Sequence, residues 1–434
     1  KLLVNHGVKV YLFDENKDRD IEAIKEKTGD SELVQIELGE LGEDALSSSQ
    51  LMVISPGIPV DAPFTDVVRN AGIPIWSEIE LAYHYGKGKI AAITGTNGKT
   101  TTTALVGEIV KAHNAKTIVV GNIGIPYTEL CDTTDDDSDT VAEISSFQLE
   151  TVIDFHPNVS AILNLTPDHL NRHYTFENYG NVKFSITKNQ TMDDVTVLNY
   201  DDEHTRAMGE KAKDHCHVVY FSRLEKPAGG VYVEDGDIIL EDGDKKINVL
   251  AIKDLKLMGA HNVENVLAAV GISYYMGVPV DVIRDVATSF KAVAHRIEYV
   301  DTVDGVAYYN DSKGTNPDAA IKGIQAMVAP TFLIGGGYDK GSEYDEWIEA
   351  FDGKVKWLVL IGQTAQKIAD CAKRHGFNSI IFEENLQDAV AYCHENAVDG
   401  DAVLLSPACA SWGQFDNYEQ RGDMFKEYVR SYKE

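Results

Sequence analysis

The feature that most constrains this chain is a glycine-rich string that directly follows a short apolar run. Residues 90–93 read Ile-Ala-Ala-Ile, and residues 94–101 read Thr-Gly-Thr-Asn-Gly-Lys-Thr-Thr. The apolar run predicts a buried strand, and the apolar spacing within residues 105–110 predicts an amphipathic helix from Thr101 to about Ala112. The chain is therefore expected to pass from a strand through a glycine-rich loop into a helix.

This order of elements is typical of a loop that holds phosphate groups. Glycines let backbone N–H groups approach an anion closely, and the helix N-terminus adds positive partial charge. Lys99 can reach the terminal phosphates, and the Thr100 hydroxyl is a suitable oxygen ligand for Mg²⁺. A simple turn with an exposed lysine is the alternative. The expected nucleotide-binding residues are Gly95, Thr96, Asn97, Gly98, Lys99, Thr100 and Thr101.

Charge and cysteine content limit the class of protein. The 434 residues include 39 Lys and Arg against 69 Asp and Glu, a formal net charge of -30, which disfavours binding to nucleic acid or anionic membranes. Five scattered cysteines without a C-x-x-C pair indicate a reducing compartment and argue against a zinc site or a disulfide framework. No apolar run approaches the roughly 18 residues of a membrane-spanning helix, and no signal peptide is visible. We expect a cytoplasmic protein.

Three α/β domains are expected, over residues 1–86, 87–296 and 297–434. In the first, apolar strands at 8–13 and 51–54 predict a Rossmann-like domain of parallel strands. Ligands bind at the carboxyl ends of such strands, which makes Ser55, Pro56 and Gly57 candidate substrate residues beside the alternative of a plain turn. Residues 1–7 look like the end of a helix, so the first strand of this domain is expected to be missing.

The second and third domains follow from the same patterns. The second is expected to be a P-loop-type ATPase domain with a mostly parallel sheet, a hairpin or meander at 231–249, and helices at 261–276 and 280–290. The third is expected to be another Rossmann-like parallel α/β domain. Its expected strands are 306–309, 331–334, 357–361 and 402–405.

Two polar residues follow apolar runs near the expected phosphate loop. Glu143 comes directly after the strand-like residues 140–142, and His169 follows the apolar run at 162–165. A carboxylate at such a strand end can complete the coordination of the Mg²⁺ that Thr100 and phosphate oxygens begin. Taken singly, a surface acid and a structural histidine are the alternatives.

Three strings together resemble the Mur ligase family, which joins amino acids to carboxylates at the expense of ATP. They are 94–101, Glu-Ile-Ser-Ser-Phe-Gln-Leu-Glu at 143–150, and Asn-Leu-Thr-Pro-Asp-His at 164–169. The resemblance implies that Glu143 binds Mg²⁺, that His169 is a ligand of a second Mg²⁺, and that Lys183 is carbamylated. A partly desolvated lysine is more readily neutral, and CO₂ converts it into an anion suited to Mg²⁺.

Further strings extend the resemblance. Asn122 lies in a Gly-Asn-Ile-Gly string that implies contact with the muramyl substrate, and His295-Arg296 matches a motif whose arginine contacts ATP. Asn265 can offer both a donor and an acceptor to an adenine edge. Asp311 can hold a ribose hydroxyl or orient Lys313.

Residues 310–317, Asn-Asp-Ser-Lys-Gly-Thr-Asn-Pro, resemble the branch of the family that adds D-glutamate. The resemblance implies ATP, two Mg²⁺ ions, and UDP-N-acetylmuramoyl-L-alanine and D-glutamate as substrates of an enzyme that forms an acyl phosphate. We expect the protein to be a monomer. Lys99, His169, Lys183 and Lys313 are the expected catalytic residues. Thr315, Lys340, Ser411 and Tyr418 are the expected amino-acid-binding residues.

Alternatives come from the same class and from other classes. Another amino-acid-adding ligase of the family, such as a folylpolyglutamate synthetase, would share the phosphate loop. A non-catalytic nucleotide-binding regulator would retain the fold, although the intact expected catalytic residues speak against it. A dinucleotide-dependent oxidoreductase ranks below both because the chain has no G-x-G-x-x-G string.

Overall fold

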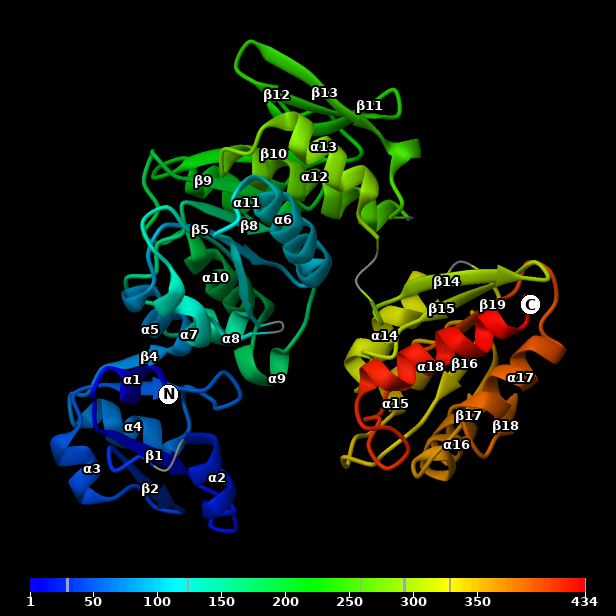
Figure 1. Cartoon of the computed structure of the whole chain (residues 1–434), viewed down its shortest axis with the longest axis horizontal. Helices are drawn as coiled ribbons and strands as arrows, with labels where there is room; N and C mark the ends of the chain where they lie inside the picture. The colour runs from blue at the N-terminus through cyan, green and yellow to red at the C-terminus, as the bar shows by residue number, and fades with distance from the viewer. Residues whose placement is uncertain (29–30, 123–124, 258, 292–293, 328, 434) are drawn as a thin grey trace. The chain divides into compact units, whose positions relative to one another are not determined.

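The computed structural model contains two compact units, Lys1–Phe290 and Lys291–Glu434 (Figure 1). The residues that it describes are 1–28, 31–122, 125–257, 259–291, 294–327 and 329–433. The first unit holds two small parallel sheets and one large sheet, and the second holds a six-stranded sheet. This confirms the expected fold class. The three domain boundaries given above remain a prediction.

The amino-terminal part of the first unit contains two pairs of parallel strands. β1 pairs with β2, and β3 pairs with β4, as two separate two-stranded sheets among the described residues. The strands follow the predicted runs closely, and β3 ends at Ile54, directly before Ser55. The elements are α1 (Leu2–Asn5), β1 (Val10–Asp14), α2 (Ile21–Thr28), β2 (Val34–Leu38), α3 (Glu43–Ser48), β3 (Met52–Ile54), α4 (Pro63–Asn70), β4 (Ile75–Ser77) and α5 (Glu78–Tyr85).

The large sheet has nine strands in the order β13-β12-β11-β10-β9-β8-β5-β7-β6. Strands β5 to β11 pair in parallel with one another, whereas the pairs β11–β12 and β12–β13 are antiparallel and form the predicted meander. Asp235 and Gly236 both have positive φ in its first turn, which suits the twist of a tight hairpin. The strands are β5 (Lys89–Thr94), β6 (Ile118–Gly121), β7 (Asp139–Glu143), β8 (Val159–Ile162), β9 (Val195–Asn199), β10 (His217–Ser222), β11 (Gly230–Glu234), β12 (Asp237–Asp242) and β13 (Lys245–Ala251).

Helices bury the central strands of this sheet. α12 packs against α6 and against β8 to β11, and α13 packs against α6 (Figure 1). Residues 90–94 of β5 and all five residues of β7 are buried, and the inner residues 90–93 and 140–142 are apolar or small rather than alternating, as in strands that are covered on both faces. The helices are α6 (Lys99–His113), α7 (Tyr127–Leu130), α8 (Ser146–Leu149), α9 (Leu170–His173), α10 (Phe176–Phe184), α11 (Glu203–Ala212), α12 (Ala260–Tyr275) and α13 (Val280–Ser289).

The second unit is a six-stranded sheet in the order β14-β15-β19-β16-β17-β18. All pairs are parallel except the edge pair β14 and β15, and the sequence patterns did not reveal β14 or β18. One core lies on each face, around Trp347 and around Phe425. The elements are β14 (Glu298–Val303), β15 (Val306–Asn310), α14 (Pro317–Ala326), β16 (Thr331–Gly335), α15 (Asp345–Glu349), β17 (Val355–Leu360), α16 (Ala365–Arg374), β18 (Ile380–Phe382), α17 (Leu386–Asn396), β19 (Ala402–Leu405) and α18 (Tyr418–Ser431).

All five cysteines are buried free thiols. Among the helices that the structure describes, none combines the length and the apolar character that a membrane crossing needs.

Candidate functional site

The glycine-rich loop joins β5 to α6, as predicted, and α6 begins at Lys99, two residues earlier than expected. Gly95 and Gly98 have φ values of 147° and 82°, which favour glycine, and Gly98 is the N-cap of the helix. The ammonium of Lys99 donates to the carbonyl oxygens of Gly95 and Thr96, each at 3.0 Å. The lysine therefore folds back over the loop, where a phosphate group would compete for it.

The loop is held in shape from several sides. The backbone N–H of Asn97 donates to Asn164 Oδ1 at 2.8 Å, and Thr96 Oγ1 lies 3.1 Å from the hydroxyl of Tyr179. Thr100 is buried in the first turn of α6 beside the partly buried Thr101. Asn265, on α12, is buried and accepts a hydrogen bond from Thr102. The structure thus brings Asn265 beside the phosphate loop.

We expect Gly98→Ala to weaken ATP binding by about tenfold or more. A Cβ at Gly98 would lie 2.2 Å from Asn265 Oδ1, and the left-handed backbone adds a strain of about 1–2 kcal/mol. Gly236→Ala is the matched control, since Gly236 has φ +85° and nothing within 4 Å of the added Cβ. Calorimetric ATP titration and thermal unfolding of both variants check this. Equal ATP affinity in the two variants would contradict it.

Glu143 occupies the carboxyl end of β7, where it is paired with Ile93 of β5 and is 2% exposed. Its Oε1 accepts a hydrogen bond from Asn122 Nδ2 at 2.9 Å, whereas its Oε2 is buried without a hydrogen-bond partner. A buried carboxylate oxygen without a partner is costly unless a cation or a donor meets it. The donor chemistry at Glu143 therefore fits a divalent cation, and Asn122 orients the carboxylate.

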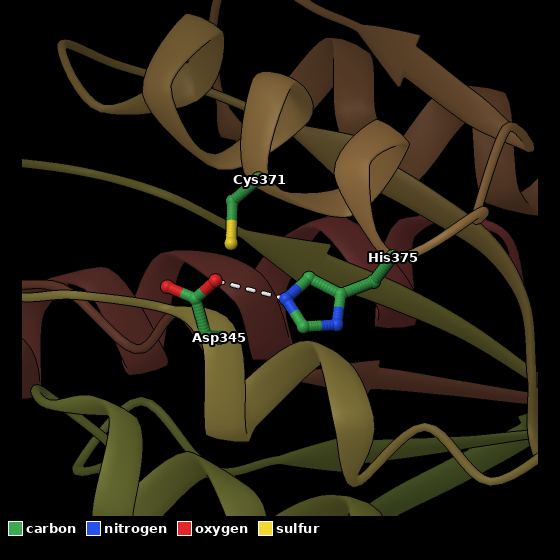
Figure 2. A group of neighbouring side chains, drawn as sticks. All are labelled: Asp345, Cys371 and His375. Atoms are coloured by element: carbon green, nitrogen blue, oxygen red, sulfur yellow. Dashed lines mark hydrogen bonds and ion pairs between the residues drawn. The ribbon is translucent and has the colours of Figure 1, made fainter.

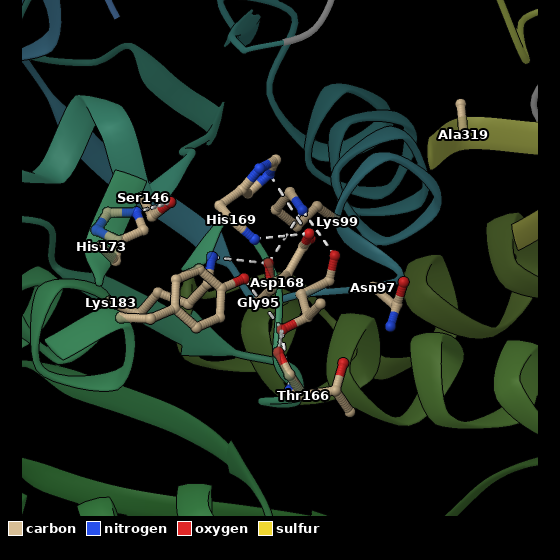
Figure 3. Close-up of polar contacts among 12 residues, drawn as sticks. Gly95, Asn97, Lys99, Ser146, Thr166, Asp168, His169, His173, Lys183 and Ala319 are labelled. Atoms are coloured by element: carbon tan, nitrogen blue, oxygen red, sulfur yellow. Dashed lines mark hydrogen bonds and ion pairs between the residues drawn. The ribbon is translucent and has the colours of Figure 1, made fainter. Parts of the chain in front are cut away.

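Lys183 lies on α10 and is buried beneath the phosphate loop (Figure 3). Its Nζ donates to the carbonyl oxygen of Gly95 at 2.9 Å and to Thr94 Oγ1 at 3.3 Å, and it lies 4.8 Å from the ring centre of Tyr179. Burial, and next the charge of Lys99, hold the pKa of Lys183 well below its usual value. The neutral amine is therefore more readily formed here than in an exposed lysine.

His169 is the N-cap of α9 and has φ 52°, a left-handed conformation. Its Nε2 lies 3.6 Å from Asp168 Oδ2, and its ring is 4.9 Å from that of Phe147. Figure 3 shows His169, Lys99 and Lys183 grouped around Gly95. The structure thus gathers the expected catalytic residues of the first unit at one sheet edge.

The sequence patterns missed a buried polar group beside His169. His173 is 1% exposed, its Nε2 lies 3.0 Å from Ser146 Oγ, and burial lowers its pKa to about 4. Arg172 forms an ion pair with Glu150 at 2.5 Å and donates to the carbonyl oxygen of Ile58 at 2.7 Å. Ser146 and Glu150 belong to the string at 143–150, and Arg172 and His173 follow His169 directly. The spacing of these residues in the sequence does not show that the two segments contact each other.

Ser55, Pro56 and Gly57 form the turn that leads to Ile58, and the N–H of Ile58 closes it onto the carbonyl oxygen of Ser55 at 3.0 Å. Ser55 and Gly57 are exposed. The contact between Arg172 and Ile58 ties this predicted substrate turn to the helix that follows His169.

Asp311 anchors the expected site of the second unit. It follows β15, is 4% exposed, and accepts a hydrogen bond from Ser406 Oγ at 2.6 Å. Burial raises the pKa of Asp311 to about 7, although the Ser406 hydrogen bond and the charge of Arg296 oppose that rise. Arg296 itself lies between His295 and Ile297, whose φ values are 64° and 44°. The structure thus brings Arg296 and Asp311 together.

Lys313 and Tyr418 also lie close together, with the ammonium 5.8 Å from the ring centre. The backbone carbonyl of Tyr418 accepts a hydrogen bond from Ser312 Oγ at 2.8 Å, and the N–H of Thr315 donates to the carbonyl oxygen of Lys313. Arg421, which the sequence patterns did not single out, is buried between these strings. It donates to Ser312 Oγ, to the carbonyl oxygen of Ser312 and to that of Cys409.

Lys340 and Ser411 occupy neighbouring strings of the same unit. Tyr338 and Ala410 form an isolated bridge, so the strings around 338 and 410 run side by side. Lys340 is exposed and lies 4.3 Å from the ring centre of Trp412, whereas Ser411 is buried. An exposed ammonium next to a buried hydroxyl can receive a carboxylate.

The phosphate loop, the buried carboxylate and the desolvated lysine define a nucleotide-dependent enzyme, and comparison with known proteins gives its family. Residues 1–77 match the MurD-like N-terminal domain of Mur ligases, residues 93–273 the Mur ligase middle domain, and residues 295–409 the glutamate ligase domain. The chain belongs to the Mur ligase family, whose members are ATP-dependent ligases.

Curated relatives and solved structures agree with this assignment. A UDP-N-acetylmuramoylalanine--D-glutamate ligase of Lachnospira eligens is 56% identical over 430 residues, which is 99% of this chain and 95% of the relative. The protein of the same name from Clostridioides difficile is 48% identical over 97% of this chain and 92% of its own. The crystal structure of UDP-N-acetylmuramate-alanine ligase from Thermotoga maritima matches with TM-score 0.55 and 20% identity over 99% and 95% of the two chains, a likeness of fold.

Proposed function

We propose that this chain adds D-glutamate to UDP-N-acetylmuramoyl-L-alanine, with conversion of ATP to ADP and phosphate, as a step of peptidoglycan precursor synthesis in the cytoplasm. The observation that carries the proposal is the 56% identity to the UDP-N-acetylmuramoylalanine--D-glutamate ligase of Lachnospira eligens, over 95% of that relative. The Asn-Asp-Ser-Lys-Gly-Thr-Asn string at 310–316, in which the Asp311 and Ser312 side chains make buried or partly buried hydrogen bonds directly before Lys313, supports it.

In this proposal the first step is phosphoryl transfer. A carboxylate oxygen of the alanyl group attacks the γ-phosphorus of ATP, the bond to the β,γ-bridging oxygen breaks, and ADP leaves. Lys99, the N–H groups of the glycine-rich loop and the amino-terminal end of α6 stabilise charge on the transferring group. Thr100 and Glu143 would hold one Mg²⁺, and His169 and carbamylated Lys183 a second, which neutralise phosphate charge when bound.

The second step forms the amide bond. The amine of D-glutamate attacks the acyl carbon, phosphate leaves, and the amine loses a proton. Lys340 and Ser411 receive the side-chain carboxylate of D-glutamate with the backbone near Tyr418, and Thr315 contacts the incoming amino acid. Asn122 and the Ser55–Gly57 turn contact the UDP-linked substrate, while Asn265, Arg296 and Asp311 hold the nucleotide. We propose that the enzyme acts as a monomer.

Phosphate release with separate amino acids tests the proposed substrate. With ATP, Mg²⁺ and UDP-N-acetylmuramoyl-L-alanine, we expect release that depends on D-glutamate, and less than about 1% of that rate with L-glutamate or L-alanine, since a site built for one carboxylate geometry rejects the others. Turnover with L-glutamate but not D-glutamate would identify another amino-acid-adding ligase. No turnover with any of them would favour a nucleotide-binding regulator.

A further inference from the structure

A cysteine, a histidine and an aspartate meet in the second unit, among residues to which the ligase reaction gives no role (Figure 2). Asp345 begins α15, Cys371 lies on α16, and His375 is the C-cap of α16, one helical turn after the cysteine. One ligand atom from each residue lies within 4.8 Å of the other two. His375 Nε2 lies 2.8 Å from Asp345 Oδ1.

The opposite nitrogen of this histidine faces a second carboxylate. His375 Nδ1 lies 3.7 Å from Glu349 Oε1, one turn along α15 from Asp345. Histidines that bind metals commonly donate their second N–H to a carboxylate, which leaves the other nitrogen free to ligate. In that tautomer Nε2 carries no proton, so a cation bound between Nε2 and Asp345 would take the place of the present hydrogen bond between them.

We propose that Asp345, Cys371 and His375 bind Zn²⁺, with water completing four ligands, and that the ion ties α15 to α16. Thiolate, imidazole and carboxylate are together typical zinc ligands, whereas Mg²⁺ avoids sulfur. Zinc bond lengths of about 2.0–2.3 Å require the Nε2–Oδ1 distance to open to about 3.3 Å, a shift within the reach of a partly exposed aspartate. The absence of a C-x-x-C pair did not exclude this site, because its ligands come from two helices.

Two neighbours bear on the site. Arg374 Nη2 lies 3.5 Å from Asp345 Oδ1, but its side chain is 60% exposed and can turn into solvent. Tyr344, next to Asp345, lies with its hydroxyl 3.1 Å from Cys409 Sγ, in the string that leads to Ser411, an expected amino-acid-binding residue. A zinc ion that holds α15 in place would therefore also stabilise the position of Cys409 and its neighbours. The similar group Glu80, His84 and Asp154 supports no such proposal, because backbone N–H groups of 153–155 already occupy both oxygens of Glu80.

Cobalt binding to the metal-free chain of residues 1–434 tests the proposal, because a cobalt–thiolate bond gives a charge-transfer band that oxygen and nitrogen ligands do not. We expect one equivalent of Co²⁺ to produce this band, Zn²⁺ to remove it, and Mg²⁺ to leave it unchanged. Cys371→Ser should abolish the band. His375→Gln and Asp345→Asn, at partly exposed positions, should each weaken Co²⁺ binding at least tenfold.

The matched controls are Cys216→Ser and His394→Gln, which lie outside the cluster and should leave the band and the affinity unchanged. Zn²⁺ should also raise the thermal unfolding midpoint of the wild-type chain but not that of Asp345→Asn. A wild-type chain that gives no thiolate band, or a band that persists in Cys371→Ser, overturns the proposal. The phosphate-release assay stays independent of this outcome, so failure of the zinc site leaves the proposed ligase reaction standing.

Discussion

Lys183→Ala is expected to lower kcat about 10³-fold, and acetate is expected to restore part of the rate. Removal of a group that supports metal and phosphate charge in the transition state has effects of this size. Burial and the charge of Lys99 lower the pKa of Lys183, so the neutral amine that reacts with CO₂ is more readily formed. In the alanine variant, a short carboxylic acid fits the vacated space and again presents two oxygens. Phosphate release with and without acetate measures both effects.

A direct observation of the carbamate separates this role from a purely structural one. Wild-type protein equilibrated with ¹³C-bicarbonate should show a carbamate carbon resonance that Lys183→Ala lacks. Lys188→Ala is the control, since Lys188 is exposed in the turn that follows α10, and it should keep the wild-type rate. If Lys183→Ala turns over at the wild-type rate, or acetate has no effect on a folded and inactive variant, the modification is not part of catalysis.

Local patterns were sufficient to predict the elements that carry the nucleotide site. These elements are contiguous in the sequence: the strand before Gly95, the loop and α6. The spacing of their apolar residues indicates which faces are buried. The same holds for the meander at 230–251, whose first turn has positive φ at both Asp235 and Gly236 and whose second has it at Gly243.

Contacts between distant strings could not be predicted in this way. Arg172 meets Ile58 across 114 residues, and Arg421 meets Ser312 across 109 residues. Hydrophobic periodicity says which side of an element is buried but not which polar group it faces there. The proposed zinc ligands Asp345 and Cys371 were not predicted from the sequence for the same reason. The edge strand β14 was missed because its residues are only partly buried and so carry a weak apolar pattern.

Arg421→Lys should lower the free energy of unfolding of the second unit by about 2–4 kcal/mol. The guanidinium is 1% exposed, and its three hydrogen bonds join the Ser312 backbone and hydroxyl to the carbonyl oxygen of Cys409. Burial lowers the pKa of Arg421 to about 10, so the group is charged at neutral pH. Lysine keeps the charge but cannot reproduce the planar fork, and each buried carbonyl left without a donor costs about 1–3 kcal/mol.

The same substitution should lower kcat about 10²-fold with little change in the KM for UDP-N-acetylmuramoyl-L-alanine. Ser312 precedes Lys313 and follows Asp311, so a shift of about 1 Å in this string misplaces both side chains. Arg430→Lys is the control, since Arg430 is an exposed residue of the same helix, α18, and its replacement should change neither quantity. Denaturant unfolding and initial rates of the two variants decide the matter. If Arg421→Lys matches Arg430→Lys in stability and in kcat, the buried fork does not position the Asp311–Lys313 string.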